Sequence, residues 1–257
     1  MNRPTRKRLP TTETNMIDAW PNLFPLQRAV WVAGLLGAIA GLGVYRIAQA
    51  YRHLALQAPE VDACLLARAV RLASVRRGRP GAAVACSLLS AGTIALAVAC
   101  LGTSLYAVAV CVAGLMAMLL ACIDTHTGLL PDALTFPLLW MGLALSWAGY
   151  GIVLQEAVAG AILGYGLLWS LRFAFLQVGG REAFGLGDAK LLAALGAWGG
   201  WRPLPFVLLL ACLLGAAYAM LQQRSLRPRG AYPFGPFLIA ASACAVVGGS
   251  ELHSGFW

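Results

Sequence analysis

Two aspartates stand beside long apolar segments, where a carboxylate needs a specific reason to be present. Asp188 closes the segment Gly185-Leu186-Gly187-Asp188 and precedes an apolar run over 191–198, while Asp124 directly follows an apolar run over 105–123. An ionised carboxylate in hydrocarbon costs several kcal/mol unless it is solvated, paired or neutralised. We therefore expect these two carboxylates to do chemistry together inside a membrane.

Paired carboxylates suit the hydrolysis of a peptide bond. Two carboxylates held close together do not both ionise readily, so the pair shares one proton near neutral pH. The ionised member then activates a water as general base, while the protonated member polarises the scissile carbonyl. This chemistry needs no metal and no covalent intermediate. Gly185 and Gly187 would allow a substrate strand to approach the backbone beside Asp188.

The polar residues around the two aspartates have other interpretations. Asp188 would also cap a helix beginning at Ala189, and both roles are compatible. Asp132 follows a proline, where a helix N-cap or a turn is the ordinary expectation. Lys190 would balance local charge or contact lipid headgroups. His126 is a candidate proton shuttle, although a single histidine near headgroups is more often incidental.

The composition places the chain in a membrane. Of its 257 residues, 60% are hydrophobic and 11% are charged, against roughly 25% charged residues in soluble domains. We predict an all-α polytopic membrane protein with about eight transmembrane helices. The apolar runs fall at 29–45, 82–100, 105–123, 133–150, 157–176, 189–200, 203–222 and 236–249, of which 189–200 is short and the last is marginal.

Charge and pattern divide the chain into three parts. Residues 1–28 are expected to form a flexible basic tail without a cleaved signal peptide. Residues 29–81 would hold the first transmembrane helix and a basic segment, with an amphipathic surface helix between Val61 and Val75. Residues 82–250 would form the membrane-embedded catalytic part.

The arginines predict the topology. Seven arginines in 46–81 place this segment in the cytoplasm. Alternating spans then bring Asp124 and Asp188 to the same, cytoplasmic face, with the five basic residues of the tail as the exception. The net charge of +9 follows from such loops, so no nucleic-acid partner is expected. The seven cysteines contain no CxxC pair, and no zinc ribbon is expected.

Three segments resemble sequence blocks of the type IV prepilin peptidases, which are intramembrane aspartic peptidases of the GxGD type (family A24). The first runs from Asp124 through 127–140, the second covers 185–198, and the third is Tyr-Pro-Phe-Gly-Pro-Phe at 232–237. The two aspartates are 64 positions apart (188 − 124), which also fits the family. The resemblance extends over about residues 82–249.

The resemblance implies a catalytic pair of Asp124 and Asp188. It implies removal of a short basic leader, after a glycine, from type IV prepilins or type II secretion pseudopilins at the cytoplasmic face of the bacterial inner membrane. The residues expected to bind substrate or support the active site are Gly185, Gly187, Lys190, Asp132, Pro233 and Gly235.

The N-terminal third departs from the family pattern. Many members carry two CxxC pairs there and N-methylate the new terminus with S-adenosylmethionine, whereas residues 47–81 contain the single Cys64. We expect proteolysis without a cofactor, and S-adenosylmethionine only if methylation is retained. The alternatives are a bifunctional peptidase and N-methyltransferase, a transporter with an aspartate relay, or a non-catalytic pilin-binding assembly factor. The sequence indicates no oligomeric state.

Overall fold

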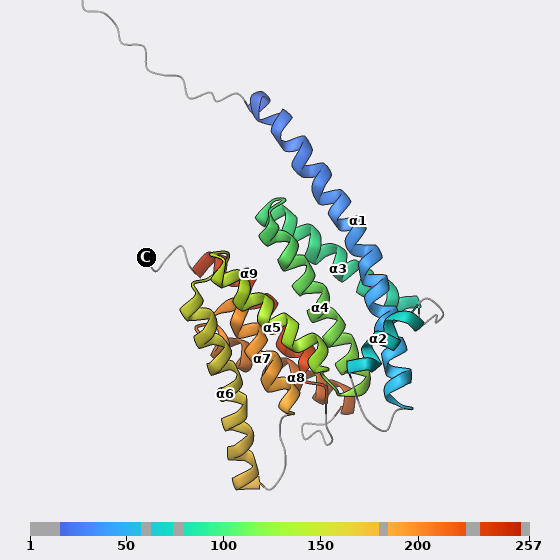
Figure 1. Ribbon diagram of the computed structural model, residues 1–257, viewed down its shortest axis with the longest axis vertical. Coiled ribbons are helices and arrows are strands. Elements are labelled where there is room, and N and C mark those ends of the chain that lie inside the picture. Colours follow the sequence, from blue (N-terminus) through green and yellow to red (C-terminus); the bar gives the residue numbers. More distant parts are fainter. Residues whose placement is uncertain (1–15, 58–62, 74–79, 180–184, 225–231, 253–257) are drawn as a thin grey trace, which may run out of the picture.

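The protein is built from helices packed side by side (Figure 1). The computed structural model describes residues 16–57, 63–73, 80–179, 185–224 and 232–252, and all regular elements in these ranges are α-helices. They are α1 (Met16–Ala55), α2 (Ala63–Leu72), α3 (Pro80–Leu101), α4 (Leu105–Thr127), α5 (Asp132–Trp147), α6 (Leu154–Gly179), α7 (Leu186–Gly199), α8 (Leu204–Gln223) and α9 (Gly235–Leu252). The predicted all-α class is confirmed.

Among the described residues, five helices have the length and composition of membrane spans. They are Gln27–Ala55 within α1, α3, α4, Leu154–Gln177 within α6, and α8. The other three predicted spans also fold as helices, but α5 has 16 residues and α7 has 14. At about 1.5 Å per residue, α7 is about 21 Å long, which is shorter than the ~30 Å of hydrocarbon. In the described ranges the structure thus supports five spans by length and composition, and the prediction of eight is not confirmed.

Glycines after α5 and α7 explain why these two helices are short. Gly149 (φ 81°) and Gly200 (φ 77°) lie just beyond the last turns and adopt positive φ angles. That conformation stops a helix and is easily reached by glycine. The apolar runs therefore continue further along the sequence than the helices do.

The N-terminal third differs from its prediction in two ways. α1 begins at Met16, so residues 16–28 of the expected tail are helical; the flexibility of the tail stays a prediction, and residues 1–15 lie outside the described ranges. α1 also continues to Ala55, which places Arg46 and Arg52 on the first helix rather than on a surface segment. Helix formation continues through these positions because arginine is a good helix former.

The amphipathic helix predicted between Val61 and Val75 is confirmed as α2. It buries Leu65 and Ala69 and exposes Arg68 and Arg71. Its buried side packs against α1. The boundary proposed at residue 82 stays a prediction.

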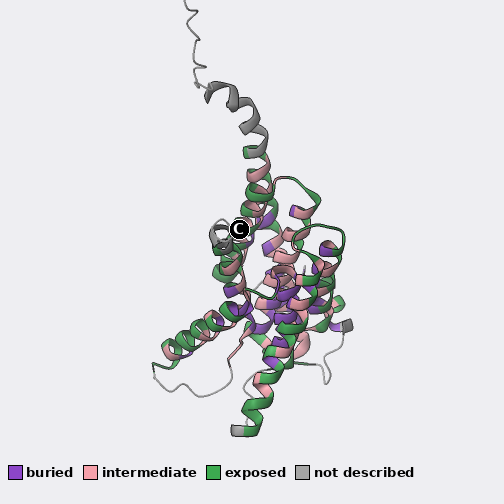
Figure 2. Cartoon of the chain, turned by 90° about the vertical axis from the view of Figure 1, so that its left-hand side faces the viewer, coloured by how far each residue is buried: buried purple, intermediate pink, exposed green. Residues whose placement is uncertain are grey.

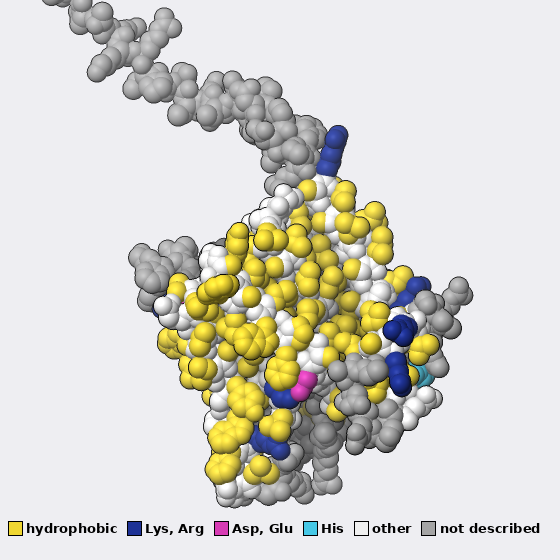
Figure 3. Space-filling model, in the orientation of Figure 1, with side chains coloured by type: hydrophobic (Ala, Val, Ile, Leu, Met, Phe, Trp, Pro, Cys, Tyr) yellow, Lys and Arg dark blue, Asp and Glu magenta, His cyan; other side chains and the backbone are white. Residues whose placement is uncertain are grey.

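The surface of the bundle is apolar. Buried residues concentrate in the centre of the bundle, while the helices that project from it are mostly exposed (Figure 2). Large side chains such as Leu88 (67% exposed), Ile162 (66%) and Leu209 (61%) point outward, and hydrophobic atoms cover most of the face shown in Figure 3. An apolar surface of this extent suits lipid rather than water.

Small residues let the helices approach closely. Gly160 on α6 lies against the backbone of Gly196 on α7, and a Cβ on either would overlap the carbonyl of the other. A Cβ on Gly164 would lie 2.6 Å from the Leu192 carbonyl oxygen. Glycines spaced four apart commonly form such contacts between membrane helices. This contact fixes α7 along α6.

Replacing Gly160 by leucine tests this contact. We expect Gly160→Leu to lower the thermal unfolding midpoint in detergent, because overpacking typically costs about 1–3 kcal/mol. Gly166→Leu is the matched control, since Gly166 is also on α6 and has no atom within 4 Å of a Cβ position. Equal midpoints for the two variants would contradict the role of the α6–α7 contact.

Candidate active site

Three helix ends meet around the two aspartates. Asp124 lies in the last turn of α4, Asp188 in the first turn of α7, and Gly235 is the first residue of α9. α9 packs against both α4 and α7, and α5 also packs against both. The two aspartates therefore lie at the same end of the bundle, while the cytoplasmic orientation of this end stays a prediction.

Asp124 is held by its own helix end and by α9. α4 stops at Gly128, which adopts the left-handed conformation (φ 65°) and donates its N–H to the Asp124 carbonyl at 2.8 Å. The Asp124 side chain is buried, and its Oδ2 accepts the Gly235 N–H at 2.9 Å. The first N–H groups of a helix have no partner within that helix. Asp124 therefore caps α9 from a different helix.

Asp188 performs the same task for its own helix. Gly185 is the N-cap of α7, and Asp188 is the third helical residue. Its buried carboxylate accepts the Gly185 N–H through Oδ2 at 3.2 Å. α7 thus begins at Leu186 and not at Ala189, so Asp188 caps through its side chain from within the first turn. The capping interpretation thus holds in this modified form, with Oδ2 as the capping oxygen.

The charge of Asp124 acts on Asp188, which lies in the first turn of α7, a helix outside the five candidate membrane spans of the described residues. Burial raises the pKa of Asp188, the charge of nearby Asp124 raises it further, and the hydrogen bond from the Gly185 N–H partly opposes both, so that the pKa is about 7. Such a group is close to half protonated at neutral pH, as the shared-proton chemistry requires.

Leu130 packs between the two glycine-containing segments. A Cβ on Gly187 would lie 3.1 Å from the Leu130 Cβ, and a Cβ on Gly235 would lie 3.4 Å from the Leu130 Cδ2 and 2.8 Å from Asp124 Oδ2. Glycine is therefore needed at both positions so that the segments carrying Leu130, Gly187 and Gly235 can pack together beside the aspartates. Sequence reasoning missed Leu130 as a site residue, although it lies inside the first family-like block.

Lys190 and Asp132 form an ion pair beside the site. Lys190 Nζ lies 2.8 Å from Asp132 Oδ1 and 2.7 Å from Oδ2, and 5.3 Å from the centre of the Phe136 ring. The pair joins α7 to α5. Asp132 is the first residue of α5 and Pro131 occupies the N-cap position, so the N-cap expectation for Asp132 is wrong. A proline with no free N–H starts this helix without a side-chain cap.

Two further predicted residues lie at this end of the bundle. Pro233 is half-buried and stands two residues before Gly235. His126 is exposed, and its Nε2 lies 3.2 Å from Gln49 Nε2 on α1. Gln49, which the sequence analysis did not select, thus links the first helix to the end of α4.

Within the described ranges, no group of three or more His, Cys, Asp and Glu side chains could hold a metal ion.

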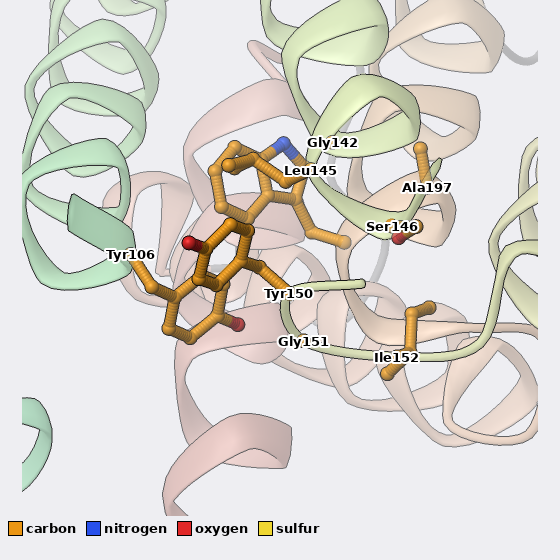
Figure 4. A pocket seen from close by; sticks show the side chains of 9 residues that line it. Tyr106, Gly142, Leu145, Ser146, Tyr150, Gly151, Ile152 and Ala197 are labelled. Carbon is orange, nitrogen blue, oxygen red and sulfur yellow. The ribbon is translucent and has the colours of Figure 1, made fainter. Parts of the chain in front are cut away.

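A small pocket lies at the other end of the bundle (Figure 4). Tyr106 in the first turn of α4 and Trp198 near the end of α7 line it, together with Tyr150 and Gly151. Its volume of about 10 Å³ gives room for one water at most. It is therefore not a substrate site, and it is remote from both aspartates.

The part of the chain that carries both aspartates is similar in sequence to known proteins. Residues 111–220, which include both aspartates, match the sequence model of the type IV leader peptidase family (Peptidase_A24). The resemblance to the prepilin peptidases is confirmed. The matched segment contains the two aspartates expected from the resemblance, which the structure brings together from α4 and α7.

Several proteins named prepilin leader peptidase/N-methyltransferase share this similarity. The one from Pseudomonas putida is 45% identical over 137 residues, which is 52% of this chain and 48% of that protein. The one from Dickeya chrysanthemi is 48% identical over 130 residues (50% and 46%), and that from Burkholderia pseudomallei strain K96243 is 45% identical over 136 residues (52% and 44%). Each match thus spans about half the length of the curated relative. No solved structure matches the chain.

The raised pKa of Asp188 predicts a pH-dependent stability. An unfolded aspartate has a pKa of about 3.9, so between about pH 4 and 7 the folded state holds a proton that the unfolded state has lost. Stability therefore falls as pH rises, by up to about 1.4 kcal/mol per pH unit, and levels off above the folded pKa. Asp188→Asn removes this titration.

Thermal unfolding of wild type and Asp188→Asn in one detergent, between pH 5 and 8, measures the effect. The unfolding midpoint of the variant minus that of wild type should increase with pH up to about pH 7. Above that pH the difference should stay constant. A constant difference across the range would show that Asp188 ionises as it does in water.

Proposed function

We propose that this protein is a membrane aspartic endopeptidase that removes the leader peptide of type IV prepilins or type II secretion pseudopilins. Cleavage would follow a glycine, at the cytoplasmic face of the bacterial inner membrane. The observation that carries the proposal is the meeting of two buried carboxylates, Asp124 on α4 and Asp188 on α7, which are 64 positions apart in sequence. The printed names of the relatives support the substrate class.

The hydrogen bonds favour one division of roles. A short backbone N–H bond stabilises the charged form of a carboxylate. Asp124 receives such a bond within the buried part of the site, at 2.9 Å from Gly235, whereas the bond from Gly185 to Asp188 is longer, at 3.2 Å. We therefore assign Asp124 as the general base and Asp188 as the protonated acid.

The reaction follows from these roles. Asp124 takes a proton from a water molecule while the water oxygen attacks the scissile carbonyl carbon. Asp188 donates a hydrogen bond and then its proton to the carbonyl oxygen. Collapse of the tetrahedral intermediate breaks the C–N bond, and the leaving amine takes up the proton held by Asp124. The pair is returned to its starting charge when Asp188 recovers a proton from the intermediate's hydroxyl.

The supporting residues would shape the entrance. Gly185 is exposed and Gly187 half-buried, so a substrate strand could approach the backbone beside Asp188. The ion pair of Lys190 and Asp132 is partly exposed, with side chains 30% and 50% accessible. Within this pair the charge of Lys190 is directed to Asp132. Pro233 and Gly235 would position the start of α9 against Asp124.

Proteolysis by this mechanism uses no cofactor. The bilayer would present the hydrophobic helix of the prepilin to the apolar surface of the enzyme.

Methyl transfer to the new N-terminus is a separate activity that appears in the names of the relatives. It would require S-adenosylmethionine. Adding this compound to the cleavage assay, followed by mass spectrometry of the product, decides whether it occurs.

Substituting the aspartates tests the mechanism. In liposomes with a prepilin, we expect Asp124→Asn and Asp188→Asn each to lose at least about 1,000-fold in cleavage rate, because neither half of the pair works alone. Glu156→Gln is the matched control, since Glu156 pairs with Arg202 (3.4 Å) at the other end of α7. Cleavage that persists in either asparagine variant would refute the mechanism, and failure of wild type on several prepilins would refute the function.

A methyl group at Gly235 tests the positioning of Asp124. It would lie 2.8 Å from Asp124 Oδ2 and force the carboxylate to move. We expect Gly235→Ala to lower kcat by about 10- to 100-fold with a smaller change in KM, since displacements of about 1 Å have such effects.

The control for Gly235→Ala is Gly114→Ala on α4, where a Cβ meets no atom within 4 Å. The control variant should cleave at the wild-type rate. If the two variants behave alike, contact between Gly235 and the carboxylate does not matter for activity.

A further inference from the structure

We propose that Cys86 and Cys122 form a dithiol that is a site of reversible oxidation, whose disulfide would join α3 to α4 next to Asp124. Their Sγ atoms are 3.5 Å apart although the residues are 36 positions apart in sequence. Among the cysteines that the structure describes, this is the one thiol–thiol contact within hydrogen-bonding distance. Both residues are half-buried free cysteines.

Packing between α1 and α3 fixes the position of Cys86 beside Cys122. The carbonyl of Cys86 accepts a hydrogen bond from Ser90 Oγ at 2.9 Å, and the same hydroxyl lies 2.7 Å from the carbonyl oxygen of Gly37 on α1. A Cβ on Gly41 would lie 2.6 Å from the Cys86 carbonyl oxygen, so α1 and α3 are in backbone contact at this point. Cys86 therefore belongs to a tightly packed α1–α3 contact and faces α4 through its sulfur.

Cys122 places the pair close to the catalytic carboxylate. It lies two residues before Asp124 in the last two turns of α4, and Ile123 and Asp124 between it and the helix end are buried. A disulfide has an S–S distance of about 2.05 Å, so the sulfurs must approach by about 1.5 Å. Because α3 is held against α1, we expect the part of that movement that rotation of the two side chains does not supply to come from the end of α4 that carries Asp124.

The chemistry is a two-electron oxidation. Each thiol loses its proton and the two sulfurs together lose two electrons as the S–S bond forms. A diazene oxidant such as diamide accepts the two protons and two electrons and becomes a hydrazine. A dithiol reductant reverses the reaction by thiol–disulfide exchange. A reducing compartment would keep the pair as thiols, which is the form that the structure shows.

Thiol counting in the full-length protein in liposomes tests the modification itself. Maleimide–polyethylene glycol tagging after denaturation should find seven thiols before diamide and five after it (7 − 2), because the chain has seven cysteines. Cys86→Ala and Cys122→Ala should each keep six (7 − 1) with and without diamide. The control Cys111→Ala, also on α4, should fall from six to four.

The effect on the site is measured by prepilin cleavage, and this part rests on the proposed function. Diamide should lower the rate about tenfold in wild type and Cys111→Ala, because the end of α4 shifts, and leave Cys86→Ala and Cys122→Ala unchanged. Dithiothreitol should restore the lost rate.

The two measurements distinguish the existence of the dithiol from its effect on the cleavage rate. Seven thiols remaining after diamide, a loss of thiols that persists in Cys86→Ala, or a linkage between two chains on a non-reducing gel would overturn the dithiol. A disulfide that forms without changing the cleavage rate would overturn its effect on Asp124. If the reduced protein cleaves no prepilin, the proposed function fails, while thiol counting still decides whether the dithiol exists.

Discussion

Two carboxylates that lie out of water and close to each other are the constraint on which the rest of this structure depends. Each of them is buried and needs polar partners, and each finds one at the start of a helix: Asp124 at α9 and Asp188 at its own helix α7. Helix starts offer unpaired N–H groups and a favourable dipole for negative charge. The same interactions that make the carboxylates tolerable therefore also fix three helix ends relative to one another.

This arrangement explains why small residues matter so much in the chain. Gly187 and Gly235 leave room for Leu130 and for the Asp124 carboxylate, and a side chain at either position would press the segments apart. Further along the bundle, Gly160 and Gly196 bring α6 and α7 into backbone contact. α7 is too short to be anchored by its length in a bilayer, so its position comes from these contacts with its neighbours. The aspartate on its first turn is placed by them.

The N-terminal helices are coupled to the site although they lie outside the segment that matches the leader peptidase family. Gln49 on α1 contacts His126, and Cys86 on α3 contacts Cys122, so both contacts reach α4 within two residues of Asp124. α1 also packs along α3 through the glycines that face Ser90. Any change in the packing of the N-terminal helices therefore acts on the helix that carries one of the two aspartates.

The sequence by itself determined the fold class and the membrane setting, and it pointed to Asp124 and Asp188, which the structure brings together. The reason is that a chain with so few charges must bury its backbone polar groups in helices within lipid, and that charged groups beside apolar runs are rare enough to stand out. The amphipathic helix α2 was equally predictable from its periodicity.

The tertiary structure alone decided the helix ends, the partners of the carboxylates and the pairs that cross between helices. Apolar runs do not show where α5 and α7 stop, because positive-φ glycines end them. Nor could sequence pair Lys190 with Asp132, Cys86 with Cys122, or Asp124 with the N–H of Gly235, which are separated by 58, 36 and 111 positions. Such pairs depend on how the helices pack, and packing is a property of the whole bundle.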